Sequence, residues 1–196
     1  ARSVAAARSD PVVPRGRLRA LGAISDIRAD QLAFTLSEAR EVIVDRMGVD
    51  LAFEDLKLLV ERTEGWPAGV SLAGLWLSEA EDPSTLVRSF SGEQRQVADY
   101  LLEEVLDVLD DETRRLLVHA SILERLSGPL CDVVLSVEGS GERLDTLARS
   151  NLFVSPVDRR GEWYRLHQLL RDLLGLELTR ENEAVVERVM DSMDLE

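Results

Sequence analysis

The chain has 196 residues, of which 45% are hydrophobic and 31% are charged, and its formal net charge is −14 at pH 7. This length allows one domain or two small ones with a hydrophobic core. The acidic balance disfavours general binding to nucleic acid, because phosphate groups are also negative. No apolar run approaches the roughly 18 residues of a membrane helix, and the start lacks the apolar core of a signal peptide, so we expect a cytoplasmic protein.

Residues 1–34 differ from the rest of the chain. They hold six arginines and three aspartates, a net +3, which leaves −17 on the remaining residues. Prolines and a glycine lie close together in 11-PVVPRG-16, and no sustained helical period follows. We expect an extended tail or the edge of a domain.

Helical signals begin at residue 35. Thr35 and Glu38 have the spacing of a capping box, which predicts a helix to about Met47, ended by Gly48. A second helix is predicted over residues 53–63, because leucines and a valine repeat there on one face.

The triplet Gly65-Trp66-Pro67 separates this helix from the next. Glycine is common where a helix stops, and proline is tolerated in a first helical turn because the N–H it lacks has no partner there. On residue types alone, the triplet is a corner between two helices. A loop with Asp82-Pro83 and a short helix come next. Residues Val97, Leu101, Val105 and Val108 then mark a long amphipathic helix.

The run 105-VLDVLDDE-112 looks like an apolar strand that ends in acidic residues, which is the form of a Mg²⁺-binding motif. Its neighbours have a helical period, and Asp110-Asp111 fit a helix cap better. We therefore assign no metal ligands. Cys131 is the only cysteine, which excludes an intramolecular disulfide, and its apolar neighbours predict a buried small side chain.

The pattern changes after residue 110. Three helices are followed by two short strands around a turn that contains glycine, which is the layout of a winged helix. A further helix begins near His167, and a last amphipathic helix spans about 180–193. The segments are helices near 111–123, 128–136 and 141–150, and strands near 151–157 and 162–166.

Three strings carry a resemblance to a known family: 61-ERTEGWPAGVSLAGLWL-77, 95-RQVADYLLEEVLDVLDDETRRLLVHASILERLSGPLCDVV-134 and 149-RSNLFVSPVDRRGEWYRLHQLLRDLL-174. They resemble the ATPase core of the MalT-like transcriptional activators, bacterial regulators of the STAND class of nucleotide switches, many of which end in a LuxR-type DNA-binding domain. The resemblance covers nearly the whole chain. It implies a mainly α fold, with a helical bundle followed by a winged-helix domain that has a small β-hairpin.

The resemblance also implies a domain order. Residues 1–34 would be the end of the nucleotide-binding domain or a linker, 35–108 the helical domain, 109–177 the winged-helix domain, and 178–196 a helix leading into the sensor. The expected partners are the P-loop nucleotide-binding domain and the sensor domain of the same polypeptide. Faces that would pack on the nucleotide-binding domain are expected to be exposed in this chain, so residues 1–34 could also mediate self-association. DNA would be bound only through a separate C-terminal domain, and the inducer through the sensor.

Three residues gain nucleotide-binding roles from the resemblance. Arg8 would sense the terminal phosphate, although Ala7 stands where the family has Ser or Thr. Pro67 matches the proline that packs on adenine, and His167 matches the histidine that reaches the β-phosphate of ADP and holds the resting state. Without the resemblance, Pro67 is a helix corner and His167 a surface or satisfied core residue. His119 matches no motif and is interpreted as structural.

The sequence contains no GxxxxGK[ST] loop, and its only lysine, Lys57, follows no glycine loop. We therefore expect no catalytic residues and no ATP hydrolysis by this chain alone. ADP or ATP, with Mg²⁺, would be held mainly by the P-loop domain.

Two alternatives remain. The winged helix could itself contact DNA or a protein, since Arg159 and Arg160 lie at the predicted hairpin tip. Its predicted recognition helix, however, is close to neutral. The same switch could also be fused to another effector, such as a protein kinase.

Overall fold

The computed structural model describes residues 15–25, 27, 29–150 and 153–193. Two short helices open the described part, and a helical bundle follows. These elements are α1 (Arg15–Ala20), α2 (Ala29–Leu32), α3 (Leu36–Arg40), η1 (Glu41–Arg46), α4 (Phe53–Thr63), α5 (Pro67–Ser78), α6 (Pro83–Val87), α7 (Arg95–Leu101) and η2 (Leu102–Leu106).

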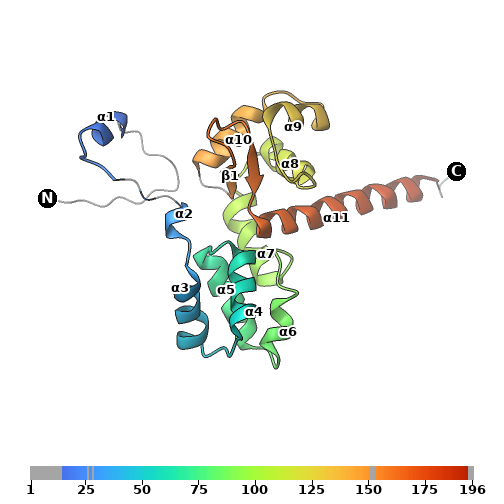
Figure 1. Ribbon diagram of the computed structural model, residues 1–196. Coiled ribbons are helices and arrows are strands. Elements are labelled where there is room, and N and C mark those ends of the chain that lie inside the picture. Colours follow the sequence, from blue (N-terminus) through green and yellow to red (C-terminus); the bar gives the residue numbers. More distant parts are fainter. Residues whose placement is uncertain (1–14, 26, 28, 151–152, 194–196) are drawn as a thin grey trace.

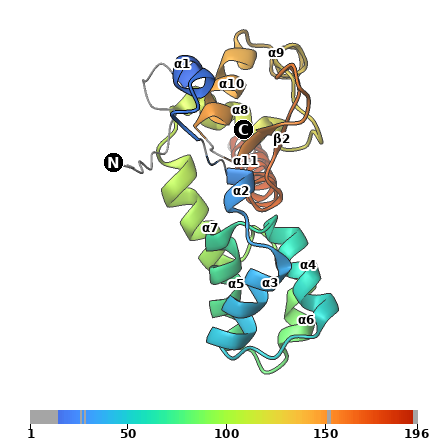
Figure 2. The same ribbon diagram turned by 60° about the vertical axis from the view of Figure 1, so that its left-hand side comes forward.

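The second half is a winged helix that continues into a long helix. Its elements are α8 (Asp111–Ala120), α9 (Gly128–Leu135), α10 (Ser140–Arg149), β1 (Val154–Pro156), β2 (Tyr164–Leu166) and α11 (Gln168–Met193). The bundle of α3–α6 and the winged helix lie at opposite ends of the molecule, with α7 running between them (Figures 1 and 2). The predicted fold class, mainly α with a small β-hairpin, is confirmed. No helix in the described ranges is both long and apolar enough to cross a membrane.

Local sequence signals set several helix starts. Thr35 and Glu38 form the predicted capping box, with Thr35 N–H donating to Glu38 Oε2 at 2.8 Å. Asp110 caps α8 by accepting the N–H of Thr113 at 2.9 Å, which confirms a helix cap at this acidic pair. These caps satisfy backbone donors that have no partner within the helix.

Two predicted helices contain wide turns that the sequence did not indicate. The helix from residue 36 passes into the π-helix η1, and the helix that begins at Arg95 passes into η2. Because η2 ends at Leu106, Val108 lies beyond it and is exposed, although the periodicity predicted it on the buried face.

The hairpin is shorter than predicted. Three residues of each strand pair antiparallel, with Val154 opposite Leu166 and Pro156 opposite Tyr164. Phe153 has a left-handed backbone (φ 57°), which ends the strand on one side. On the other side, Asp158 accepts the N–H groups of Glu162 and Trp163 and closes the turn.

The sequence predicted two C-terminal helices, but the structure has one, α11, which is 26 residues long. Gly175 lies within this continuous helix, and its carbonyl accepts the Thr179 hydroxyl at 3.0 Å. Arg180 and Glu177 add an ion pair of 2.9 Å on its surface. A lone glycine lowers helix stability by only about 1 kcal/mol, which the neighbouring turns offset.

The start of α11 joins the two halves of the core. Leu169, Leu170, Leu173 and Leu174 are almost completely buried, and α11 packs against α4, α7 and α8. Its backbone also lies against Gly92, whose N–H donates to Asp172 Oδ2 at 3.1 Å. A single helix therefore contributes to both the helical bundle and the winged helix.

Gly92→Ala is expected to lower the free energy of unfolding by roughly 1–3 kcal/mol, because a Cβ there would overlap the carbonyl group of Leu169. Gly175→Ala is the matched control. Its Cβ would meet nothing within 4 Å, and alanine should raise helix stability by about 0.5–1 kcal/mol. Urea denaturation of both variants measures the difference, and equal midpoints would contradict the close packing of Gly92 on α11.

Candidate functional site

The Gly65-Trp66-Pro67 triplet forms a tight corner between α4 and α5. Glu64 and Gly65 both adopt left-handed backbone conformations (φ 49° and 69°). A Cβ on Gly65 would lie 2.6 Å from the carbonyl oxygen of Phe34, so only glycine fits. Pro67 is the first residue of α5, as predicted, and is half-buried.

Trp66 fills this corner with an aromatic cluster. Its ring centroid lies 4.9 Å from that of Phe153, 5.4 Å from that of Tyr100 and 6.1 Å from that of His167. Edge-to-face pairs of this kind add to the stabilisation from burial. Gly69 makes room for the indole, because a Cβ there would lie 2.5 Å from Trp66 Cε3. The side chain beside Pro67 therefore packs directly on the winged helix.

His167 lies at the same corner, and both of its ring nitrogens have partners. Nε2 is 3.0 Å from the carbonyl oxygen of Thr63, and Nδ1 accepts the N–H of Leu169 at 3.2 Å. This pattern assigns the proton of the neutral ring to Nε2, from which it is donated to Thr63. Burial lowers the pKa of His167, although the nearby Glu64 carboxylate and the Thr63 carbonyl oppose that effect.

A bidentate ion pair lies beside this histidine. Arg165 donates to Glu64 Oε1 at 2.8 Å and to Oε2 at 2.6 Å, and Gln168 N–H donates to Oε1 at 3.1 Å. Burial alone would raise the pKa of Glu64, but the Arg165 guanidinium, His167 and the Gln168 N–H bring it below its ordinary value. Sequence reasoning missed both residues. The sequence did contain a signal for this pair, because Glu64 directly precedes the triplet and Arg165 lies two positions before His167.

The structure thus brings two of the three predicted nucleotide-binding residues to one corner. Trp66, the neighbour of Pro67, contacts the ring of His167. Arg8 lies outside the described residues, so its predicted role stays a prediction. Among the described side chains, no group of three or more His, Cys, Asp or Glu is placed to hold a metal ion.

Several arginines of the winged helix have partners within the protein, whereas Arg159 and Arg160 near the hairpin tip are exposed. Arg143 on α10 pairs with Glu112 and Asp110, and Arg149 pairs with Asp145 at 2.8 Å. Arg171 donates from Nε to the carbonyl of Ser121 at 3.1 Å. These contacts lower the positive charge available to phosphates.

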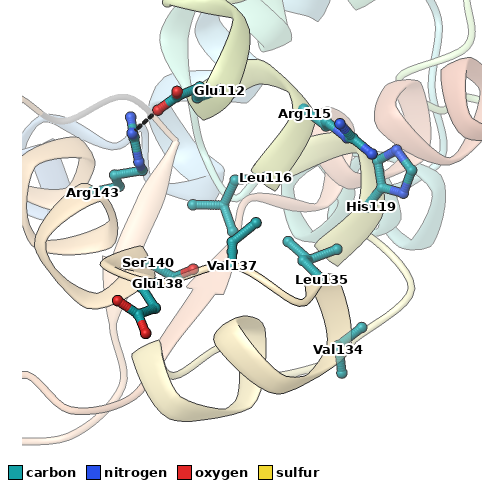
Figure 3. Close-up of a pocket in the computed structure, with 10 residues that line it drawn as sticks. All are labelled: Glu112, Arg115, Leu116, His119, Val134, Leu135, Val137, Glu138, Ser140 and Arg143. Atoms are coloured by element: carbon teal, nitrogen blue, oxygen red, sulfur yellow. Dashed lines mark hydrogen bonds and ion pairs between the residues drawn. The ribbon is translucent and has the colours of Figure 1, made fainter.

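A separate hollow of about 440 Å³ lies between α8 and the α9–α10 segment (Figure 3). Leu116, Leu135 and Val137 give it an apolar lining, and Arg115 and His119 lie together on one side. His119 Nε2 also lies 3.5 Å from Glu181 Oε2 on α11. Neither Pro67 nor His167 lines this hollow, so it is distinct from the corner.

Comparison with known proteins agrees with this architecture. The family model of the MalT winged helix domain matches residues 102–186. The serine/threonine-protein kinase PknK of Mycobacterium tuberculosis (strain H37Rv) is 32% identical over 168 residues, 86% of this chain and 15% of the kinase.

Two regulators show similar matches. The HTH-type transcriptional regulator MalT of Klebsiella pneumoniae (strain MGH 78578) is 30% identical over 87% of this chain and 19% of the regulator. That of Vibrio cholerae is 29% identical over 88% of this chain and 19% of the regulator. The chain therefore spans less than a fifth of these relatives. Residues 102–186 therefore match a MalT-type winged helix, and most of the chain is similar to a part of the MalT regulators and of PknK.

Proposed function

We propose that this chain is the regulatory helical and winged-helix part of a nucleotide-controlled switch in a longer bacterial signalling protein. The observation that carries the proposal is that His167 packs on Trp66, the residue directly before Pro67. A nucleotide held at this corner would touch both domains. Pro67 would pack on the adenine, and His167 would donate to a phosphate of ADP and so hold the resting state.

The corner offers the two types of group that a nucleotide needs, an apolar surface for the base and hydrogen-bond donors for the phosphates. The Pro67 ring is only half-buried and provides a rigid apolar face. Trp66, the residue before α5, makes no side-chain cap, so the first N–H groups of α5 have no such partner. The Nε2 proton of His167 is held by Thr63, and a phosphate oxygen could accept it instead.

The remaining parts of the nucleotide site would come from elsewhere in the polypeptide. The phosphate-binding loop, the Mg²⁺ site and any hydrolysis belong to the proposed P-loop domain, and Arg8 would add a phosphate contact from the edge of that domain. The effector domain that the switch would control would also lie outside this segment. Relatives include a transcriptional regulator and a protein kinase, so either effector is compatible with the proposal.

The full-length protein should bind ADP more tightly than the 196-residue chain alone. Pro67→Ala and His167→Ala in the full-length protein should each weaken ADP binding. A hydrogen bond to a charged group contributes about 1.5–3 kcal/mol, of which roughly 1 kcal/mol remains after the bond to Thr63 is given up, so we expect roughly 5-fold for His167→Ala. Isothermal titration measures the affinity, with His119→Ala as the control that should leave it unchanged. Unaltered ADP binding in both Pro67→Ala and His167→Ala would contradict the proposed role of the corner.

Acid should weaken this corner through His167. Burial lowers its folded pKa, so the unfolded chain takes up the proton first, and stability falls as the pH drops below the unfolded value of about 6.5. Protonation of Nδ1 would also remove the acceptor for Leu169 N–H. Between about pH 7 and 5.5, His167→Gln should lose less unfolding free energy than the wild type, since glutamine does not titrate.

Urea denaturation at the two pH values measures this difference. Equal declines in His167→Gln and the wild type would show that His167 is not buried as a neutral ring.

A further inference from the structure

Glu64 joins two parts of the chain that are 101 positions apart. It follows the last residue of α4 and has a left-handed backbone (φ 49°), which non-glycine residues rarely adopt. Its carboxylate accepts two hydrogen bonds from the Arg165 guanidinium and one from Gln168 N–H. Charge-assisted bidentate pairs of this kind restrict geometry as well as adding energy.

The two groups that Glu64 binds stand on either side of His167 in the sequence. Arg165 is in β2, two residues before His167, and Gln168 is the first residue of α11. The carboxylate therefore fixes the chain before and after the histidine. The neighbouring residue, Thr63, supplies the carbonyl that accepts the Nε2 proton.

We propose that Glu64 is a positioning residue of the switch: it binds the chain on both sides of His167 and thereby holds the imidazole at the corner that precedes Pro67. The effect of Glu64 on nucleotide control rests on the proposed function, whereas its effect on the position of His167 does not depend on that function. When the Glu64–Arg165 pair is broken, the leucines of α11 stay buried, but the chain beside His167 loses a polar contact with the corner, so the imidazole is held less firmly.

Three charged groups act on the imidazole: Glu64 from the corner, Arg165 from β2 and Asp172 from α11. Glu64 and Asp172 raise the pKa of His167, whereas burial and Arg165 lower it. Replacing Glu64 with glutamine keeps the side-chain shape but removes one of the charges that raise the pKa. The pKa of His167 in Glu64→Gln should therefore fall below the wild-type value.

The test uses Glu64→Gln and Arg165→Gln, alone and together, in the 196-residue chain. Glu61→Gln is the matched control, because Glu61 is an exposed carboxylate on the same helix whose ion-pair partner is Lys57, at 3.9 Å. The sequence has only two histidines, so the His167 signal can be assigned and followed in an NMR titration.

We expect Glu64→Gln to lower both the pKa of His167 and the unfolding midpoint. Glu61→Gln should change neither. The loss of stability caused by Arg165→Gln should largely disappear when Glu64→Gln is already present, as expected for two partners of one interaction. Identical His167 pKa values in Glu64→Gln and Glu61→Gln would overturn the positioning role.

ADP binding to the full-length protein separates this proposal from the proposed function. If His167→Ala and Glu64→Gln both weaken ADP binding and Glu61→Gln does not, the positioning role in the switch is supported. If His167→Ala alone weakens it, Glu64 does not act through His167. If neither affects ADP binding but the pKa of His167 shifts in Glu64→Gln, Glu64 still positions the ring and the nucleotide role fails.

Discussion

The contact between the α4–α5 corner and the start of α11 is the constraint on which the arrangement of the two domains depends. The carbonyl of Thr63 accepts both the N–H of Trp66, at 2.8 Å, and the Nε2 proton of His167, at 3.0 Å. The first bond closes the corner within the helical bundle, and the second attaches the winged helix to it. One backbone oxygen therefore takes part in both a local turn and a contact between domains.

Apolar packing and polar contacts at this junction depend on each other. The buried leucines in the first turns of α11 contribute most of the burial, and burial of apolar area is not directional. The direction comes from the ion pair of Glu64 with Arg165 and from the imidazole. Trp66 belongs to both sets, because its ring packs on the winged helix while its backbone N–H closes the corner.

Residues whose partners are close in the chain were the ones that the sequence predicted well. The limits of α4, the capping box at Thr35, the cap at Asp110 and the position of Pro67 all depend on neighbours within a few residues. The pairing of Glu64 with Arg165 was missed, because the two residues are 101 positions apart and only their places beside the triplet and beside His167 pointed to it. The continuity of α11 was missed for another reason: its buried first turns stabilise a helix that local preference alone would interrupt at Gly175.

The hydrogen bond of His167 to Thr63 bears on how the proposed switch would operate. A bond between neutral partners contributes about 0.5–1.5 kcal/mol, whereas one to a charged group contributes about 1.5–3 kcal/mol. A phosphate at the corner could therefore compete for the Nε2 proton with a net gain of roughly 1 kcal/mol. A gain of this size would shift the ring between two acceptors without destroying the fold, because Glu64 and the leucines of α11 would still hold the domains together.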